Sequence, residues 1–232
     1  MTGYEARRDA TWPPQALPAS RAEFLARTYS HLLGAIAGFT LIEVALFRSG
    51  LAETIAAALL GVSWLFVLGV FVVASWLASR VAAQAESLPA QYAALGGFVL
   101  AEAIIFVPLF YIANAYAPGA ISSAALVTLA GFAGLTTVVF VTRKDFSFLR
   151  GIVGFGMVLA LVAIVAGALF GFELGTWFSV AMVGLAGAAI LRDTSTIMRS
   201  FPEDSYVAAS LQLFASVALM FWYVLRLFTS RR

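Results

Sequence analysis

The sequence predicts an all-α integral membrane protein, built as a bundle of about seven transmembrane helices. One observation is the composition: 62% of the 232 residues are hydrophobic and only 11% are charged, whereas a soluble domain carries about 25% charged residues. The other is that the apolar residues form blocks of about 20, the length of a helix that crosses a bilayer. Because lipid offers no partner to an open sheet edge, these blocks are expected to be helices.

Seven apolar blocks follow one another along the chain, and each is expected to span the membrane. The linkers between them are short, which predicts one transmembrane domain over residues 28–232. The polar residues 1–27, which include three prolines, are expected to form a flexible tail. The expected spans cover residues 29–47, 55–77, 92–113, 121–141, 152–170, 176–197 and 206–228.

The distribution of basic residues predicts the orientation of the chain. Ten of the fourteen lysines and arginines lie in the tail and in the second, fourth and sixth loops. An excess of basic residues marks the cytoplasmic side, so we expect a cytoplasmic N-terminus and, after seven spans, an external C-terminus. Three arginines near the C-terminus oppose this assignment, and a re-entrant last segment is the alternative to a full crossing.

Composition and motifs argue against several functions. The chain has no cysteine and one histidine, His31, which rules out thiol chemistry and a cysteine-ligated metal site. The basic residues are scattered, so nucleic-acid binding is not expected. No phosphate loop, zinc motif or nucleophile triad is found in the sequence. We therefore expect no enzyme and no cofactor, and we interpret His31 as an interfacial anchor.

Ionisable residues inside the spans are the candidate site, because each costs about 2.5–3.5 kcal/mol at mid-bilayer on insertion scales. At 1.5 Å per residue, Asp193, Glu102 and Ser216 lie about 10–15 Å from the cytoplasmic ends of their spans. Two neighbouring carboxylates do not both ionise easily, so this group is a candidate pH sensor or ion path. In the alternative interpretation, Arg192, Arg80 or hydroxyl groups satisfy the carboxylates, and the group only holds the helices together.

Glu43 is a weaker candidate, because it lies near the outer end of the first span. Tyrosine and tryptophan residues near the span ends are expected to form interfacial belts, not a binding cage.

Two segments of the chain carry recognisable motifs. One is the end of the sixth span, residues 190–197, where Asp193 precedes Thr194. The other is the loop after the fourth span, which contains Thr142, Arg143, Lys144, Asp145 and Ser147. In these motifs, and in their order and spacing from about residue 24 onward, the chain resembles the Bax inhibitor-1 family. The resemblance implies a seven-helix fold with its last helix near the centre of the bundle.

The same resemblance implies a pair of site residues. Several family members are thought to leak calcium under the control of two aspartates, one on the sixth span and one on the seventh. Asp193 matches the first position, but Ser216 occupies the second, so the aspartate pair is absent and any bound Ca2+ is transient. A serine here is similar to the bacterial YccA-like branch, which is associated with modulation of the membrane-anchored AAA protease FtsH.

Two hypotheses about function follow. The one favoured by the sequence is a modulator of membrane-protein quality control in the bacterial inner membrane, which contacts lipid and an FtsH-type AAA protease. The other is a pH-sensitive calcium or cation leak through the bundle, with Glu102 in place of the lost carboxylate. Neither hypothesis requires a particular oligomeric state.

Overall fold

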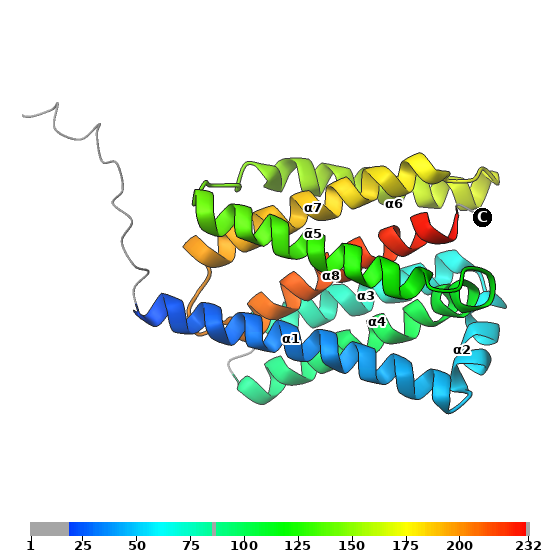
Figure 1. Cartoon of the computed structure of the whole chain (residues 1–232), viewed down its shortest axis with the longest axis horizontal. Helices are drawn as coiled ribbons and strands as arrows, with labels where there is room; N and C mark the ends of the chain where they lie inside the picture. Colours follow the sequence, from blue (N-terminus) through cyan, green and yellow to red (C-terminus); the bar gives the residue numbers. More distant parts are fainter. Residues whose placement is uncertain (1–18, 85–86, 231–232) are drawn as a thin grey trace, which may run out of the picture.

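The computed structural model in Figure 1 is a bundle of α-helices, and it describes residues 19–84 and 87–230. Within these residues, seven helices are long and apolar enough to cross a membrane, which confirms the predicted fold class. They are α1 (Ala19–Arg48), α3 (Trp64–Gln84), α4 (Leu88–Tyr116), α5 (Ala120–Thr142), α6 (Leu149–Phe170), α7 (Thr176–Arg199) and α8 (Tyr206–Thr229). A shorter helix, α2 (Leu51–Leu60), follows α1.

The second predicted span, residues 55–77, is wrong in its boundaries. The helical structure is interrupted between α2 and α3. The N–H of Gly61 donates to the carbonyl oxygen of Ala57 at 3.0 Å, and α2 ends there. The sequence hides this break because α2 is also apolar: Ala52 and Ala56 are buried against α4. Of these two helices, α3 is the one long and apolar enough to cross a membrane.

The predicted tail, residues 1–27, is too long, because α1 begins at Ala19. Residues 1–18 lie outside the described residues. The error arises because the first turns of α1 combine charged residues with a buried apolar face, which includes Phe24 and Leu25. Because of its charged residues, such a segment resembles a polar tail, although its apolar residues have the spacing of an amphipathic helix.

The start of α1 is attached to the connection between α7 and α8. The guanidinium of Arg21 donates to the carbonyl oxygen of Phe201 at 2.7 Å and lies 3.3 Å from a carboxylate oxygen of Glu203. The ring of Phe24 stacks on that of Phe201 at 6.3 Å between centroids. Residues 19–27 are therefore an integral part of the bundle.

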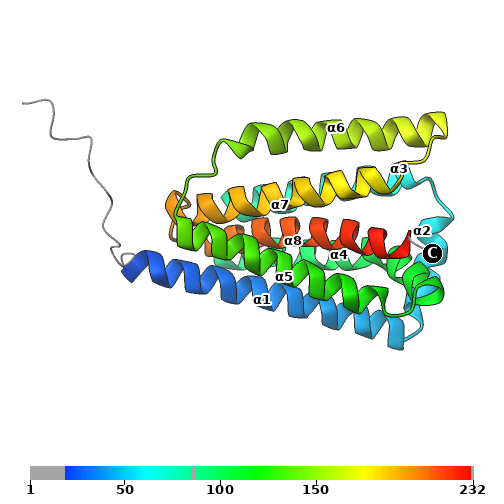
Figure 2. The same cartoon turned by 45° about the horizontal axis from the view of Figure 1, so that its top comes forward.

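The central helix is α8, which packs against α1, α3, α4, α5 and α7 (Figure 2). Within its apolar stretch 72% of the residues are buried, against 17% in α5 and in α6. This agrees with a last helix near the bundle centre. Because α8 is continuous over 24 residues, about 36 Å at 1.5 Å per residue, it extends along the bundle and does not turn back.

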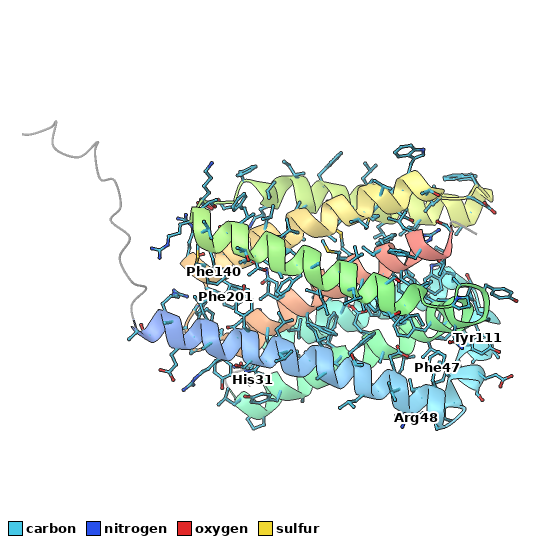
Figure 3. The ribbon with its side chains drawn as sticks, in the orientation of Figure 1. His31, Phe47, Arg48, Tyr111, Phe140 and Phe201 are labelled. Atoms are coloured by element: carbon cyan, nitrogen blue, oxygen red, sulfur yellow. The ribbon has the colours of Figure 1, made fainter. Side chains whose placement is uncertain are left out.

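The long helices alternate in direction, so the two ends of the bundle differ. One end, called the basic end, holds the start of α1, the end of α3, the start of α4 and the connections α5–α6 and α7–α8. The opposite end holds α2 and the last residues of α1 and α8 (Figure 1). Figure 3 shows Phe140 and Phe201 at the basic end, and Phe47, Arg48 and Tyr111 at the opposite end. That the basic end faces the cytoplasm stays a prediction.

Phenylalanines join α1, α4 and α8 inside the bundle. Phe39 of α1 lies 5.2 Å from Phe106 and 6.2 Å from Phe214, measured between ring centroids. Phe221 lies 5.7 Å from Phe110 and 5.5 Å from Phe106. Such separations are favourable for aromatic pairs. We call these five residues the phenylalanine cluster.

Candidate functional site

Asp193 is fully buried on α7 and connects this helix to α8. Its Oδ2 accepts a hydrogen bond from the hydroxyl of Ser216 at 2.6 Å, and its Oδ1 accepts one from Nε2 of Gln212 at 2.7 Å. The guanidinium of Arg192 lies 2.5 Å from the same Oδ1. Both carboxylate oxygens are therefore bound, and α8 supplies two of the three partners.

The sequence analysis did not identify Gln212 as part of this site. It lies four residues before Ser216, and residues with this spacing share one face of a helix. A polar side chain at that position in an otherwise apolar helix is a signal that a search for charges alone does not detect.

A cavity of about 810 Å³ adjoins Asp193, between α3, α4, α6, α7 and α8. Arg192, Glu102 and Ser216 line it, and most of its other lining residues are apolar. The lining continues along α8 to Arg226, which donates to the carbonyl oxygen of Leu174 at 3.2 Å. From Ser216 to Arg226 the cavity follows α8 for about 15 Å.

Glu102 lies in this cavity but does not contact Asp193. Its residue is 6% exposed, and no described residue forms a hydrogen bond or ion pair with it. The structure thus brings Asp193 and Ser216 into direct contact and places Glu102 in the same cavity. The group is not a pair of hydrogen-bonded carboxylates.

Arg80 is separate from this group. Its Nε donates to Oε1 of Gln84 at 3.3 Å, and its guanidinium lies 5.1 Å from the ring centroid of Trp76. The interpretation in which Arg80 satisfies Asp193 or Glu102 is therefore wrong. Arg80 is in the last turns of α3, where a long basic side chain extends towards the membrane surface.

The loop between α5 and α6 is attached to the end of α7. The backbone N–H of Phe146 donates to the hydroxyl of Ser195 at 3.1 Å, and Arg199 donates to the carbonyl oxygen of Arg143. Ser195 is two residues from Asp193. The loop therefore helps to fix the part of α7 that carries the buried carboxylate.

Within the same loop, short polar contacts fix the backbone. The hydroxyl of Thr142 donates to the carbonyl oxygen of Val138 at 2.7 Å and accepts from the N–H of Lys144 at 3.4 Å. The N–H of Ser147 donates to Oδ1 of Asp145 at 2.8 Å.

Comparison with known proteins identifies the family. A family model described as "Inhibitor of apoptosis-promoting Bax1" matches residues 21–232, almost the whole chain. The chain belongs to the Bax inhibitor-1 family. The resemblance carried by the α5–α6 loop and by the end of α7 is thereby confirmed for the family, while the YccA-like branch stays a prediction.

Among individual proteins, an uncharacterized protein of Pseudomonas aeruginosa is 34% identical over 111 residues. The match covers 47% of this chain, and the chain spans about half the length (49%) of that relative.

Asp145 gives the loop of this Bax inhibitor-1 family member a pH dependence. The hydrogen bonds from the backbone and side chain of Ser147 hold the pKa of Asp145 below its usual value. The charged form is thus favoured in the folded loop, and this contribution is present at neutral pH and lost as the pH falls through the lowered pKa. Asp145→Asn is expected to lower the protection of the Ser147 amide against hydrogen exchange, relative to its intrinsic rate, at neutral pH. The variant is also expected to lack the loss of protection that the wild-type protein shows as the pH falls through the lowered pKa of Asp145. Unchanged exchange would contradict this role, and Glu173→Gln, at the opposite end of the bundle, is the matched control.

His31 lies in the half of α1 nearer the basic end (Figure 3) and joins this helix to the start of α4. Its Nδ1 lies 2.7 Å from the carbonyl oxygen of Arg27, and its Nε2 lies 2.8 Å from the hydroxyl of Tyr92. Since a carbonyl only accepts, Nδ1 carries the proton, and in the neutral ring Nε2 accepts from Tyr92. These contacts support its interpretation as an anchor.

Glu43 lies in a different cavity, between α1 and α5.

Proposed function

We propose that this protein is a gated cation leak, and that the conformation described above is closed. The observation that carries the proposal is the ion pair of Asp193 with Arg192 at one end of a cavity that also holds Glu102. Ionisable groups inside a membrane are costly and mark ion or proton pathways in many membrane proteins. The hydrogen bonds of Asp193 also hold α7 to α8, but Glu102 has no partner among the described residues and therefore no such structural role.

The charges suggest how the closed state is held. Glu102 has no cationic partner among the described residues, so its carboxylate attracts a cation that enters the cavity. At the end near Asp193, the guanidinium of Arg192 repels the same cation. Opening requires α7 and α8 to separate where Ser216 and Gln212 bind Asp193.

Flux measurements on reconstituted protein test the proposal. Purified protein in liposomes that contain a calcium or potassium indicator is expected to pass at least one cation faster than protein-free liposomes, at one or more pH values between mildly acidic and mildly alkaline. Equal flux with and without protein, for both ions and at every pH, would overturn the proposal.

A second function, modulation of a membrane-anchored AAA protease, is supported by the exposed surface at the basic end. The side chains of Lys144, Asp145 and Ser147 are exposed there, at the end of the bundle where α1 starts. If the basic end is cytoplasmic, a soluble protease domain can reach the α5–α6 loop and the start of α1.

Deletion of residues 2–18 tests this second function, because it leaves Arg21 and its contacts with the α7–α8 connection. The truncated protein is expected to turn over more slowly than the full chain in cells that contain the protease, and at the same rate in cells without it. Removal of residues 231–232 is the control at the other end of the chain. If the first truncation changes neither turnover nor co-purification with the protease, the protease hypothesis is wrong.

A further inference from the structure

A second cavity, of about 430 Å³, lies towards the opposite end of the bundle. Its volume falls in the range of about 300–1,000 Å³ found for ligand sites. Residues of α1, α4, α5 and α8 line it. Its lining shares Ala218 with the larger cavity but includes none of the residues that bind Asp193, so the inference drawn from it is independent of the proposed leak.

The cavity opens between α1 and α5. Over the described residues these two helices make no close backbone contact, although both pack against α8, which lines the cavity with Phe214, Val217 and Phe221. Nearer the basic end, the ring of Tyr29 lies 5.9 Å from that of Phe140 and fills the space between them. At the cavity itself, Val44 and Leu129 are exposed apolar residues of the lining. The opening therefore faces lipid once the bundle is in a membrane.

Glu43 gives this cavity an unsatisfied carboxyl group. Its residue is only 4% exposed, and neither carboxylate oxygen has a hydrogen-bond partner among the described residues. The hydroxyl of Thr128, on α5, is also buried and without a partner. A buried polar group without a partner costs about 1–3 kcal/mol, and more if it is charged. A ligand that donates hydrogen bonds would remove this cost.

The walls of the cavity favour a cationic ligand. Among the described residues that line the cavity, Glu43 is the one that is ionisable, so no basic side chain of this set competes for it. The phenylalanine cluster supplies Phe39, Phe110, Phe214 and Phe221 to the lining, and the faces of aromatic rings attract cations. A carboxylate beside several aromatic rings fits an ammonium group, and the remaining apolar surface fits a hydrocarbon chain.

We propose that this cavity binds the ammonium group of an amphiphilic amine that enters sideways from the bilayer. The N–H groups of the ammonium donate to the carboxylate of Glu43 and to the hydroxyl oxygen of Thr128. The alkyl chain leaves the cavity between α1 and α5. Two sources supply this chemistry: a lipid with a primary-amine head group and a free long-chain amine.

Photolabelling in liposomes tests the proposal. The probe is a long-chain primary amine with a photoactivatable diazirine in its chain, and the control probes are an alcohol and a trimethylammonium compound of the same length. The amine is expected to label the segments around Val44 and Leu129 saturably, about tenfold more than the alcohol. Charge-assisted hydrogen bonds of about 1.5–3 kcal/mol account for such a ratio. The trimethylammonium probe, which has no N–H, is expected to fall between the two.

Glu43→Gln is expected to reduce labelling by the amine about tenfold and to leave labelling by the alcohol unchanged. Glu102→Gln is the matched control, because it changes the other buried glutamate, which lies in the other cavity. Vesicles with phosphatidylethanolamine compete with the probe if the ligand is a lipid, whereas only added free amine competes if it is not. Equal labelling of the wild-type protein by amine and alcohol would overturn the proposal, whether or not the variant folds.

Discussion

Arg192→Gln is expected to raise cation flux through the bundle about tenfold. The substitution removes the positive charge at the end of the larger cavity and leaves Asp193 with its hydrogen bonds from Ser216 and Gln212. Two unit charges about 8 Å apart interact by about 2 kcal/mol at an effective dielectric constant of about 20. Since about 1.4 kcal/mol corresponds to a factor of ten, the loss of this repulsion is large enough to measure.

Asp193→Asn is expected to have the opposite effect. The amide keeps an oxygen that accepts a hydrogen bond from α8, so α7 and α8 stay joined, while the guanidinium of Arg192 loses its carboxylate. Flux through this variant should fall to the level of protein-free liposomes. Arg80→Gln is the matched control, since Arg80 contacts Gln84 and Trp76 and does not line the cavity. If Arg192→Gln and Arg80→Gln behave alike, or if Asp193→Asn raises the flux, the electrostatic account of the closed state is wrong.

Ser216→Asp is expected to make cation flux rise steeply with pH. The hydroxyl of Ser216 lies 2.6 Å from Oδ2 of Asp193, so the new carboxyl group must share a proton with the old one. At low pH the shared proton holds α7 to α8. At high pH the proton is lost, and two carboxylates about 4 Å apart repel each other by about 4 kcal/mol at an effective dielectric constant of about 20.

The matched control for this effect is Ser216→Asn, which has a similar size and does not titrate. We expect more than a tenfold change in the flux of Ser216→Asp between mildly acidic and mildly alkaline pH, and a flat profile for Ser216→Asn. Identical pH profiles for the two variants would show that the contact between Ser216 and Asp193 does not control the path.

Most of the fold follows from the sequence, because lipid permits few structures and the blocks of apolar residues have the length of a membrane-spanning helix. The two errors in the boundaries occur where the length of an apolar run or the polarity of a segment does not match the helix that forms there. The apolar run continues across the break at Gly61, because α2 packs against α4 at the end of the bundle. The amphipathic start of α1 was assigned to the tail because Arg21 and its neighbours are charged.

The site was predictable in part. Depth along the spans places Asp193 and Ser216 at one level, and the structure joins them. Depth does not say which way a side chain points. The sequence therefore could not show that Glu102 does not contact Asp193, or that Gln212 binds it. The ligand cavity beside Glu43 depends on the spacing of α1 and α5, which no local pattern encodes.

The central position of α8 has a consequence for the order in which the protein is made. A ribosome produces α1–α7 before α8, so these helices enter the membrane before the helix around which they pack exists. Until α8 arrives, Asp193 lacks Ser216 and Gln212, and Phe39 lacks Phe214. A chain interrupted before α8 therefore exposes an incompletely satisfied carboxylate and an unfilled core. Such a chain therefore differs from a finished one in the polar and aromatic groups that it leaves unpaired in the membrane.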